Sequence, residues 1–314
     1  MSSSKAKHIE VRIPRTIPEN TRIDAYIADV LKLFSRSQVR HRVTALRVNG
    51  SAAKVSKHLR PGDRLEITYG EEPGLQLEPE QIELRILYED GNVLVIDKEQ
   101  GMVVHPAGGN WSGTLVNALL WHYAGLRNGF ATDEGRPGIV HRLDKDTSGV
   151  IITAKNAETR EFLSEQFRRR TVMKRYLAVV EGSLPAGRGR IDTWLARDPH
   201  HRKRFTCLLP GSGAPPGRRA LTFYRELKSI NGFSLVSLRP RTGRTHQLRV
   251  HMAHLGCPIV GDRLYGWKAG GRGTWPLMLH AHRLRIKLPG ELQPRTFEAP
   301  VPDRFEEFYS FSSR

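Results

Sequence analysis

The sequence predicts an α+β protein of two domains, a small N-terminal one and a larger one. The larger domain is expected to be a mixed, mostly antiparallel β-sheet with flanking helices. A length of 314 residues is enough for two domains that each bury a core. In the larger part, short apolar runs bounded by turn residues outnumber helical patterns, which favours a sheet. A proline-containing acidic run at 71–83 marks the boundary between the two parts.

The N-terminal part is expected to begin with a flexible basic arm, residues 1–18, which is polar and contains two prolines. From Thr21 the pattern becomes helical, and Thr21 with Asp24 forms a candidate capping box. The apolar stripe of this helix consists of Ile23, Tyr26, Ile27, Val30, Leu31 and Phe34, at three- and four-residue spacing.

A second short helix is predicted through Val43, and it carries Arg36, Arg40 and Arg42. Asn49-Gly50 then predicts a two-residue hairpin. Between residues 21 and 70 there are ten Lys/Arg and four Asp/Glu, a net charge of 10 − 4 = +6. Residues 19–70 therefore form a small basic domain suited to a phosphate backbone, with those three arginines as candidate contacts.

The boundary run has a different character from both of its neighbours. Residues 71–83 contain five glutamates and no Lys or Arg. Such a segment is predicted to be a solvated, extended linker that avoids lying on a polyanion.

The larger domain, residues 84–314, is predicted from turns, alternation and helical periodicity. The expected elements are a hairpin at 86–97, helices at 113–123, 157–170 and 246–255, strands at 150–155, 176–181 and 233–238, and a closing helix.

The charge balance indicates the partner. The chain has 50 Lys+Arg against 32 Asp+Glu, a formal charge of +18, which favours nucleic acid. No apolar run approaches the ~18 residues of a membrane span, so no membrane partner is expected. The N-terminus lacks the apolar core of a signal peptide, and two cysteines are too few for a disulfide framework. A reducing, cytoplasmic location is therefore expected.

One carboxylate stands in a basic setting. Asp144 lies in HRLDKDTSG, directly after Arg142 and Leu143. Positive neighbours favour the ionised form of a carboxylate and suit it to act as a nucleophile or base. The alternative is a turn aspartate that binds a nearby backbone N–H. Asp146 adds a DxD pattern typical of phosphotransferases, but Ser148 stands where that motif needs Thr or Val.

An arginine-rich stretch follows much later in the chain. From residue 227 to 261 there is no Asp or Glu but five Lys/Arg, which is typical of a phosphate-tracking surface. Within it, His251, His254 and Cys257 fall three apart. Gly256 and Pro258 are expected to end that helix before Cys257 shares the face of the histidines, so no metal site is predicted.

Four separated segments carry a family resemblance: GIVHRLDKDTSGV at 138–150, KRYLAVVEG at 174–182, GRTHQLRVHMAHLGCPIVGD at 243–262 and LHAHRL at 279–284. Together they resemble the RluA-type RNA pseudouridine synthases over nearly the whole chain, from about residue 20 to 305. VVHPAGGN at 103–110 and the domain before it are similar to the RluD-like subgroup, which modifies large-subunit ribosomal RNA. Residues 19–70 resemble an S4 RNA-binding domain.

The resemblance implies a pseudouridine synthase fold and a metal-free, cofactor-free isomerisation. It places Asp144 at the essential aspartate, as nucleophile or base, and Tyr176 at the position that stacks on the detached uracil. Arg249 matches the arginine whose bidentate fork pairs with the aspartate. From the residues alone, Tyr176 could instead be a core tyrosine and Arg249 a phosphate contact on a helix face.

For RNA, the resemblance implies that Arg142 enters the stack in place of the flipped base. The one-sided charge of the arginine-rich stretch indicates that Arg241 and Arg244 bind phosphates. The expected partner is large-subunit ribosomal RNA or its precursor, and the expected state is a monomer. Two other functions stay open at this point: a non-catalytic ribosome-assembly factor, and a synthase of the same family that acts on tRNA.

Overall fold

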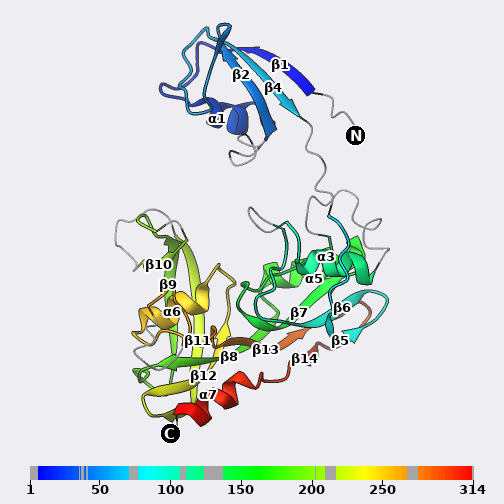
Figure 1. Cartoon of the computed structure of the whole chain (residues 1–314), viewed down its shortest axis with the longest axis vertical. Helices are drawn as coiled ribbons and strands as arrows, with labels where there is room; N and C mark the ends of the chain where they lie inside the picture. Colours follow the sequence, from blue (N-terminus) through cyan, green and yellow to red (C-terminus); the bar gives the residue numbers. More distant parts are fainter. Residues whose placement is uncertain are drawn as a thin grey trace. The chain divides into compact units, whose positions relative to one another are not determined.

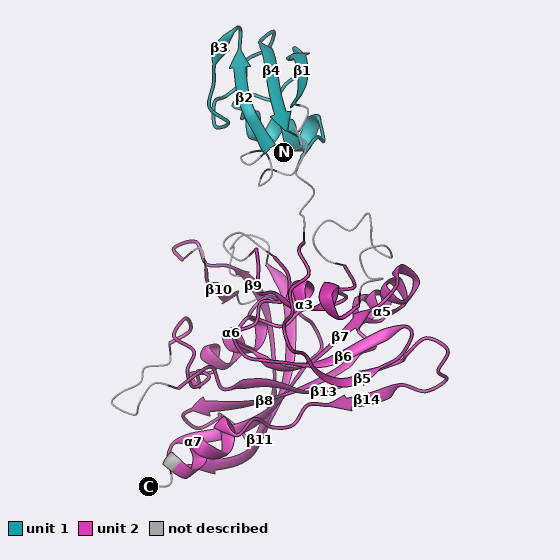
Figure 2. Ribbon diagram, turned by 45° about the vertical axis from the view of Figure 1, so that its right-hand side comes forward, with its two compact units in different colours: residues 1–76 teal, residues 77–314 magenta. Residues whose placement is uncertain are grey.

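The chain folds into two compact units, residues 1–76 and 77–314, which are coloured separately in Figure 2. The computed structural model describes residues 6–34, 36, 39, 42–70, 77–106, 111–123, 137–201, 203–208, 217–266 and 275–312. Within those residues, no helix is both long and apolar enough to cross a membrane.

The first unit is a four-stranded antiparallel sheet in the order β1-β4-β2-β3 with short helical segments. The strands are β1 (Ala6–Arg12), β2 (Val43–Val48), β3 (Ser51–Ala52) and β4 (Arg64–Gly70), and the helical segments are α1 (Ile23–Ala25) and the π-helical η1 (Tyr26–Val30). The predicted hairpin is confirmed, because Asn49 and Gly50 both have positive φ, 55° and 79°, as a primed turn requires.

Three expectations for this unit are wrong. Residues 6–12 of the expected arm form β1, an edge strand in register with β4. The helix from Thr21 is interrupted: α1 passes directly into η1, and Val30 is 54% exposed instead of lying on the apolar stripe. The capping box is absent, since the Thr21 hydroxyl donates to the Pro18 carbonyl and Asp24 accepts from Arg22. Arg36 and Arg42 are helical, whereas Arg40 lies outside the described residues.

The second unit is built on a ten-stranded sheet whose main path runs β10-β9-β11-β12-β8-β13-β7-β6-β5, with β14 added to β13 (Figure 1). Its strands are β5 (Arg85–Glu89), β6 (Val93–Lys98), β7 (Ser148–Ala154), β8 (Met173–Glu181), β9 (Arg188–Arg197), β10 (Phe205–Leu208), β11 (Arg218–Ile230), β12 (Phe233–Pro240), β13 (Leu279–Ile286) and β14 (Arg295–Glu298). Among these strands β13 and β7 pair in parallel and the other pairs are antiparallel. The predicted mixed, mostly antiparallel sheet is therefore confirmed.

Four helices flank the sheet close to the predicted positions: α3 (Leu115–His122), α5 (Ala157–Arg169), α6 (Gln247–His254) and α7 (Arg304–Ser312). The sequence of α5 sets both of its ends. The Asn156 side chain caps it by accepting from the Thr159 N–H at 2.9 Å, and Arg170 ends it in the left-handed conformation, φ 59°.

Two apolar clusters form the core of this unit. One lies around β6, β7, α3 and α5, and the other around β8, β12, α6 and α7. Tyr176, on β8, packs against both clusters. The parallel joint between β7 and β13 depends on Gly149, whose φ is +112° and where a Cβ atom would lie 2.3 Å from the Ala281 carbonyl oxygen.

The acidic run is only partly a linker. Residues 77–83 belong to the second unit: Leu77 is buried in its core, and the Glu78 carbonyl accepts from Asn117 Nδ2 at 2.8 Å. The Glu80 carboxylate accepts the Gly113 N–H at 3.0 Å. The expected linker of 71–83 therefore ends too late in the chain. Its last residues form hydrogen bonds with α3 and with the segment just before that helix.

Candidate active site

A pocket of about 450 Å³ opens where the loop after β12, the segment before β7 and the end of α5 meet over β8. The predicted residues Asp144, Tyr176 and Arg249 all line it, although they lie on three separate segments of the chain. Arg142, Arg241 and Arg244, predicted as RNA contacts, line the same pocket.

The charge of the lining is strongly one-sided. Its cations are Arg142, Arg168, Arg170, Lys174, Arg241, Arg244 and Arg249. Against these seven, Asp144 is the one carboxylate among the described lining residues. Such a lining attracts a polyanion and leaves a single carboxylate for chemistry on it.

The Asp144 loop is held by the turn that follows β6. Lys98, 1% exposed, donates from Nζ to the Lys145 carbonyl at 3.1 Å and to two carbonyls of its own turn. Gln100 donates to the Asp146 carbonyl at 2.8 Å. Burial lowers the pKa of Lys98 to about 8, and Asp146 and Asp144 oppose that shift. The turn therefore fixes the backbone on which the Asp144 side chain is mounted.

Arg249 is aimed differently from the prediction. Its fork donates from Nε and Nη2 to Asp262 at 2.7 and 2.8 Å, and the Asp262 side chain is fully buried. Asp144 receives only a looser ion pair, 3.6 Å between Arg249 Nη1 and Asp144 Oδ2. The predicted bidentate pairing with Asp144 is wrong, because the fork is already occupied and a single edge of the guanidinium faces the pocket carboxylate.

Tyr176 reaches the pocket from the strand beneath it. Burial raises the pKa of Tyr176, and the negative charge of Asp144 raises it further. The phenol therefore stays protonated at neutral pH, and it offers an aromatic face and a hydroxyl beside the carboxylate.

His246 and Tyr265 complete the network behind Arg249. Tyr265 Oη accepts the Phe205 N–H at 3.0 Å and lies 2.8 Å from His246 Nδ1. Burial lowers the pKa of His246, so the ring is neutral. The Tyr265 ring also lies 5.1 Å below the Arg249 guanidinium.

Two further residues of the lining carry shifted pKa values. Burial lowers the pKa of Lys174 to about 8, and its Nζ reaches the loop after β12 at Gly243. His141 is structural: its Nε2 accepts the Ile152 N–H at 3.1 Å, its ring stacks on Phe167 at 4.5 Å, and burial lowers its pKa to about 3.

The comparisons with known proteins agree on one family. Residues 92–254 match the family described as RNA pseudouridylate synthase. The chain belongs to this RNA pseudouridylate synthase family. A ribosomal large subunit pseudouridine synthase D of Borreliella burgdorferi is 41% identical over 309 residues, 96% of this chain and 93% of that protein. One of the same name from Xanthomonas campestris is 39% identical and covers 92% of this chain and 88% of that protein.

Solved structures of the family share the fold. Human RNA pseudouridylate synthase domain containing 4 superposes with a TM-score of 0.55 at 26% identity, over 73% of this chain and 91% of that chain. Human RNA pseudouridylate synthase domain containing 1 gives 0.54 at 28% identity, over 78% and 98%. The chain is accordingly a pseudouridine synthase, and the pocket of Asp144 is its candidate active site.

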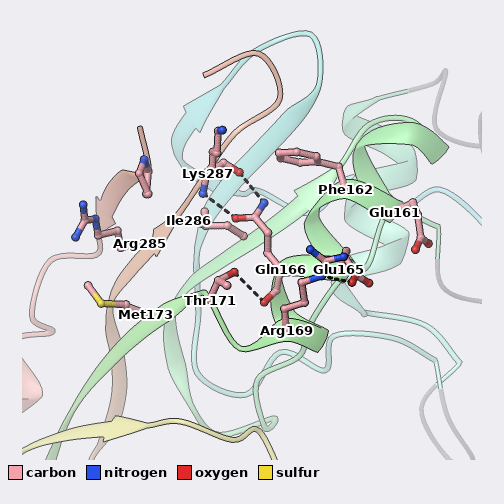
Figure 3. Close-up of a pocket in the computed structure, with 11 residues that line it drawn as sticks. Glu161, Phe162, Glu165, Gln166, Arg169, Thr171, Met173, Arg285, Ile286 and Lys287 are labelled. Carbon is pink, nitrogen blue, oxygen red and sulfur yellow. Dashed lines mark hydrogen bonds and ion pairs between the residues drawn. The ribbon is translucent and has the colours of Figure 1, made fainter. Parts of the chain in front are cut away.

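This synthase has a second, larger pocket of about 680 Å³ beside α5, between that helix and the ends of β8 and β13 (Figure 3). Gln166 bridges to the backbone of Lys287 there, and Arg169 pairs with Glu165 at 2.6 Å. Its two carboxylates, Glu161 and Glu165, form ion pairs with Arg168 and Arg169 on the same helix, and no tyrosine is among the described residues that line it. Size alone therefore does not locate the active site.

Sequence reasoning missed three parts of the site. Asp262 directly follows the acid-free stretch, and His246 is one of several histidines near it, so neither position by itself indicates a role. Lys98 gave no signal, because a lone lysine after a strand is ordinarily a surface residue. Among the described residues, no three His, Cys, Asp or Glu side chains are grouped so as to hold a metal ion.

Proposed function

We propose that this enzyme isomerises specific uridines of large-subunit ribosomal RNA to pseudouridine, with Asp144 as the reacting carboxylate. The observation that carries the proposal is the pocket lining: one carboxylate among seven cations, beside Tyr176. The names of the relatives, ribosomal large subunit pseudouridine synthases, support this class of RNA as the substrate.

The reaction breaks the N1–C1′ bond of uridine, turns the uracil and joins C5 to C1′. A proton leaves C5 and one is gained at N1, so atoms and charge balance without a second substrate or a cofactor. Asp144 acts at C1′ as nucleophile, or as the base that begins the cleavage. Tyr176 supplies a face on which the detached uracil stacks, a contact worth about 1–3 kcal/mol for a base on an aromatic ring.

The uridine must leave its helix before it reaches Asp144, which costs a few kcal/mol of unstacking. Arg142 is exposed at the rim of the pocket and can fill the vacated space in the stack. Arg241 and Arg244 then bind flanking phosphates. Arg249, fixed by Asp262, keeps a positive edge against Asp144 and so directs that carboxylate.

The first unit is proposed to be an S4-like RNA-docking domain, whose residues 21–70 carry a net charge of 10 − 4 = +6. Arg36 and Arg42 are candidate contacts in the described part of it. Without residues 1–75 we expect weaker RNA binding and a smaller salt dependence, because fewer counterions are released. The enzyme is proposed to act in the cytoplasm, as a monomer.

Asp144→Asn tests the proposal. Asn has the shape of Asp but is neither a nucleophile nor a base, so pseudouridine formation in the rRNA should vanish. RNA affinity should stay equal or become tighter, because a negative charge leaves a positive pocket. Turnover at a sizeable fraction of wild type would contradict the role of Asp144. Wild-type protein that binds the rRNA but forms no pseudouridine would instead indicate a non-catalytic assembly factor.

A further inference from the structure

The sheet of β9, β11 and β12 has two faces of opposite character. On the inner face, alternate residues of β9 are buried under α6, whose His251 contacts Thr193 and Thr222 at 3.1 and 2.9 Å. Residues between them point to the other side, because side chains alternate along a strand. We call that other side the outer face; it carries Arg190, Asp192, Trp194, Arg219, Phe223 and Arg239.

The register of the strands orders these residues in rows across the sheet. Trp194 is opposite Arg219. Four residues from Trp194 along β9, past Asp192, Arg190 is opposite Phe223, which is itself opposite Arg239 on β12. Aromatic and cationic side chains are thus neighbours across the strands.

The charge of the outer face is not balanced by the protein. Arg219 donates from Nε and Nη2 to the Asp192 carboxylate at 2.9 and 2.7 Å. This pair neutralises the one carboxylate in these rows. Arg190 and Arg239 are exposed, and among the described residues neither has a carboxylate within ion-pair distance. The next row adds Arg188 opposite Arg225, both exposed.

The aromatic rings of the outer face are accessible as well. Trp194 is 43% exposed, which is unusual for the largest apolar side chain in a strand. The guanidinium of Arg239 lies 5.2 Å from the centre of the Phe223 ring. A stack of arginine on a ring presents a flat, cationic surface, which is suited to an unpaired base.

This face is connected to the candidate active site by the loop at the C-terminal end of β12. β12 ends at Pro240 and leads directly into the loop of Arg241 and Arg244 that lines the pocket. Arg244 donates from Nε to the Arg219 carbonyl at 3.2 Å. A strand of RNA leaving the pocket over Arg244 therefore meets Arg219 and Trp194 next.

We infer that the outer face of β9, β11 and β12 binds a single-stranded segment of the same RNA, flanking the target uridine. Bases stack on Trp194 and on the Phe223–Arg239 surface, while Arg190, Arg188 and Arg225 bind phosphates. A duplex would bind the arginines but keep its bases stacked on one another, and so would leave both rings unused. The inference rests on the proposed function, because it takes ribosomal RNA as the ligand.

The experiment uses the full-length enzyme and two cognate rRNA fragments, a short hairpin around the modified uridine and the same hairpin with single-stranded flanks. Arg190→Gln/Arg225→Gln, which removes two of the phosphate contacts, is compared with Arg85→Gln/Arg295→Gln, which removes two positive charges from β5 and β14 at the other end of the sheet. On the flanked RNA, the slope of log affinity against log salt should shrink by about 1.4 for the first pair only, at about 0.7 per phosphate contact.

Trp194→Ala should weaken binding of the flanked RNA by roughly tenfold through the lost stacking. It should leave both the affinity and the single-turnover rate on the short hairpin as in wild type. Photo-crosslinking of wild-type enzyme to thiouridine placed in the flanks should label the peptide that contains Trp194, a readout that requires no variant to fold.

If the outer-face variants bind the flanked RNA as the control pair does, and no crosslink forms on β9, the inference is wrong and an acidic protein or an anionic membrane becomes the candidate partner. Absence of pseudouridine from wild-type reactions on rRNA would instead contradict the proposed function, and the crosslink would still report on the face. The two failures are therefore distinguishable.

Discussion

Among the described residues of the second unit, the same arginine–aspartate fork occurs twice, once in the candidate active site and once on the outer face. Arg249 binds Asp262 through Nε and Nη2 at 2.7 and 2.8 Å, and Arg219 binds Asp192 through the same atoms at 2.9 and 2.7 Å. The side chains of the first pair are 12% and 0% exposed, whereas those of the second are 59% and 29% exposed. Identical hydrogen bonds thus occur in opposite surroundings.

Burial decides what each fork does. In water, the attraction between two charges is screened and the pair contributes little to stability. In the interior, a charge without its partner is costly, so the inner fork fixes the direction of the guanidinium. Only there does a third group, Asp144, lie against the remaining edge at 3.6 Å. The buried pair holds a guanidinium against the candidate catalytic carboxylate Asp144, and the exposed pair only neutralises Asp192.

The largest effect is expected for Arg249→Met. Asp144 loses its cation and Asp262 is left buried without a counter-charge, so the single-turnover rate should fall by on the order of 100- to 1000-fold. The controls are Arg241→Met and Arg244→Met, which should weaken RNA binding while the saturated rate stays nearly normal. A normal saturated rate for Arg249→Met would place it among the phosphate contacts and remove the difference between the two forks.

Asp262→Asn is expected to come next. The substitution keeps the shape but leaves the Arg249 guanidinium without a buried counter-charge, at a cost of about 3–5 kcal/mol in the free energy of unfolding. Urea unfolding measures that cost. The rate should fall as well, because the freed guanidinium can turn toward Asp144 in more than one geometry. An unchanged urea midpoint would mean that the inner fork behaves like the exposed one.

A third test uses pH to separate buried from exposed cations. The pKa of Lys174 is lowered to about 8, so it loses its proton as pH rises from 7 to 9 and the pocket loses a positive charge. Affinity for the short hairpin should fall several-fold over that range in wild type and less in Lys174→Arg, which stays charged. Lys98 titrates near the same pH in both proteins, so the difference between them isolates Lys174. Parallel pH profiles would show that Lys174 does not meet the RNA.

The smallest effect is expected for Asp192→Asn. The exposed fork should be lost with no measurable shift of the urea midpoint and no change in rate on the short hairpin. Affinity for the flanked RNA should instead rise slightly, because Arg219 is released to bind a phosphate. A destabilisation as large as that of Asp262→Asn would show that burial is not what distinguishes the two pairs.

The sequence predicted which residues line the pocket better than it predicted the hydrogen bonds among them. Asp144, Tyr176 and Arg249 were brought together by matching separate segments to a family, and the structure places all three in one lining. The partner of the Arg249 fork was assigned wrongly, because Asp262 follows α6 and a turn at Gly256, and only the three-dimensional path brings it back under the helix. Spacing along a chain contains no such information.

The misassigned elements of the first unit have a similar cause. β1 has only two apolar residues in alternation, Ile9 and Val11, and it exists through pairing with β4, about 60 residues later. The stripe from Ile23 to Phe34 fits one helix, yet the chain turns through η1 and leaves Val30 in solvent. Local periodicity could not reveal either, whereas the hairpin at Asn49-Gly50 is a purely local signal and was predicted correctly.

The hydrogen bonds that Lys98 and Gln100 donate to the Asp144 loop have a consequence for the order of events in the reaction. Ordering a free loop costs roughly 1–2 kcal/mol for each residue at the moment the substrate arrives. Here the carbonyls of Lys145 and Asp146 are tied down by the protein itself, so the arriving RNA meets a loop already in its working conformation. The binding free energy that would have gone into folding residues 144–147 remains for drawing the uridine out of its stack. The slow motion before chemistry should therefore be an opening of the RNA and not a closing of the enzyme.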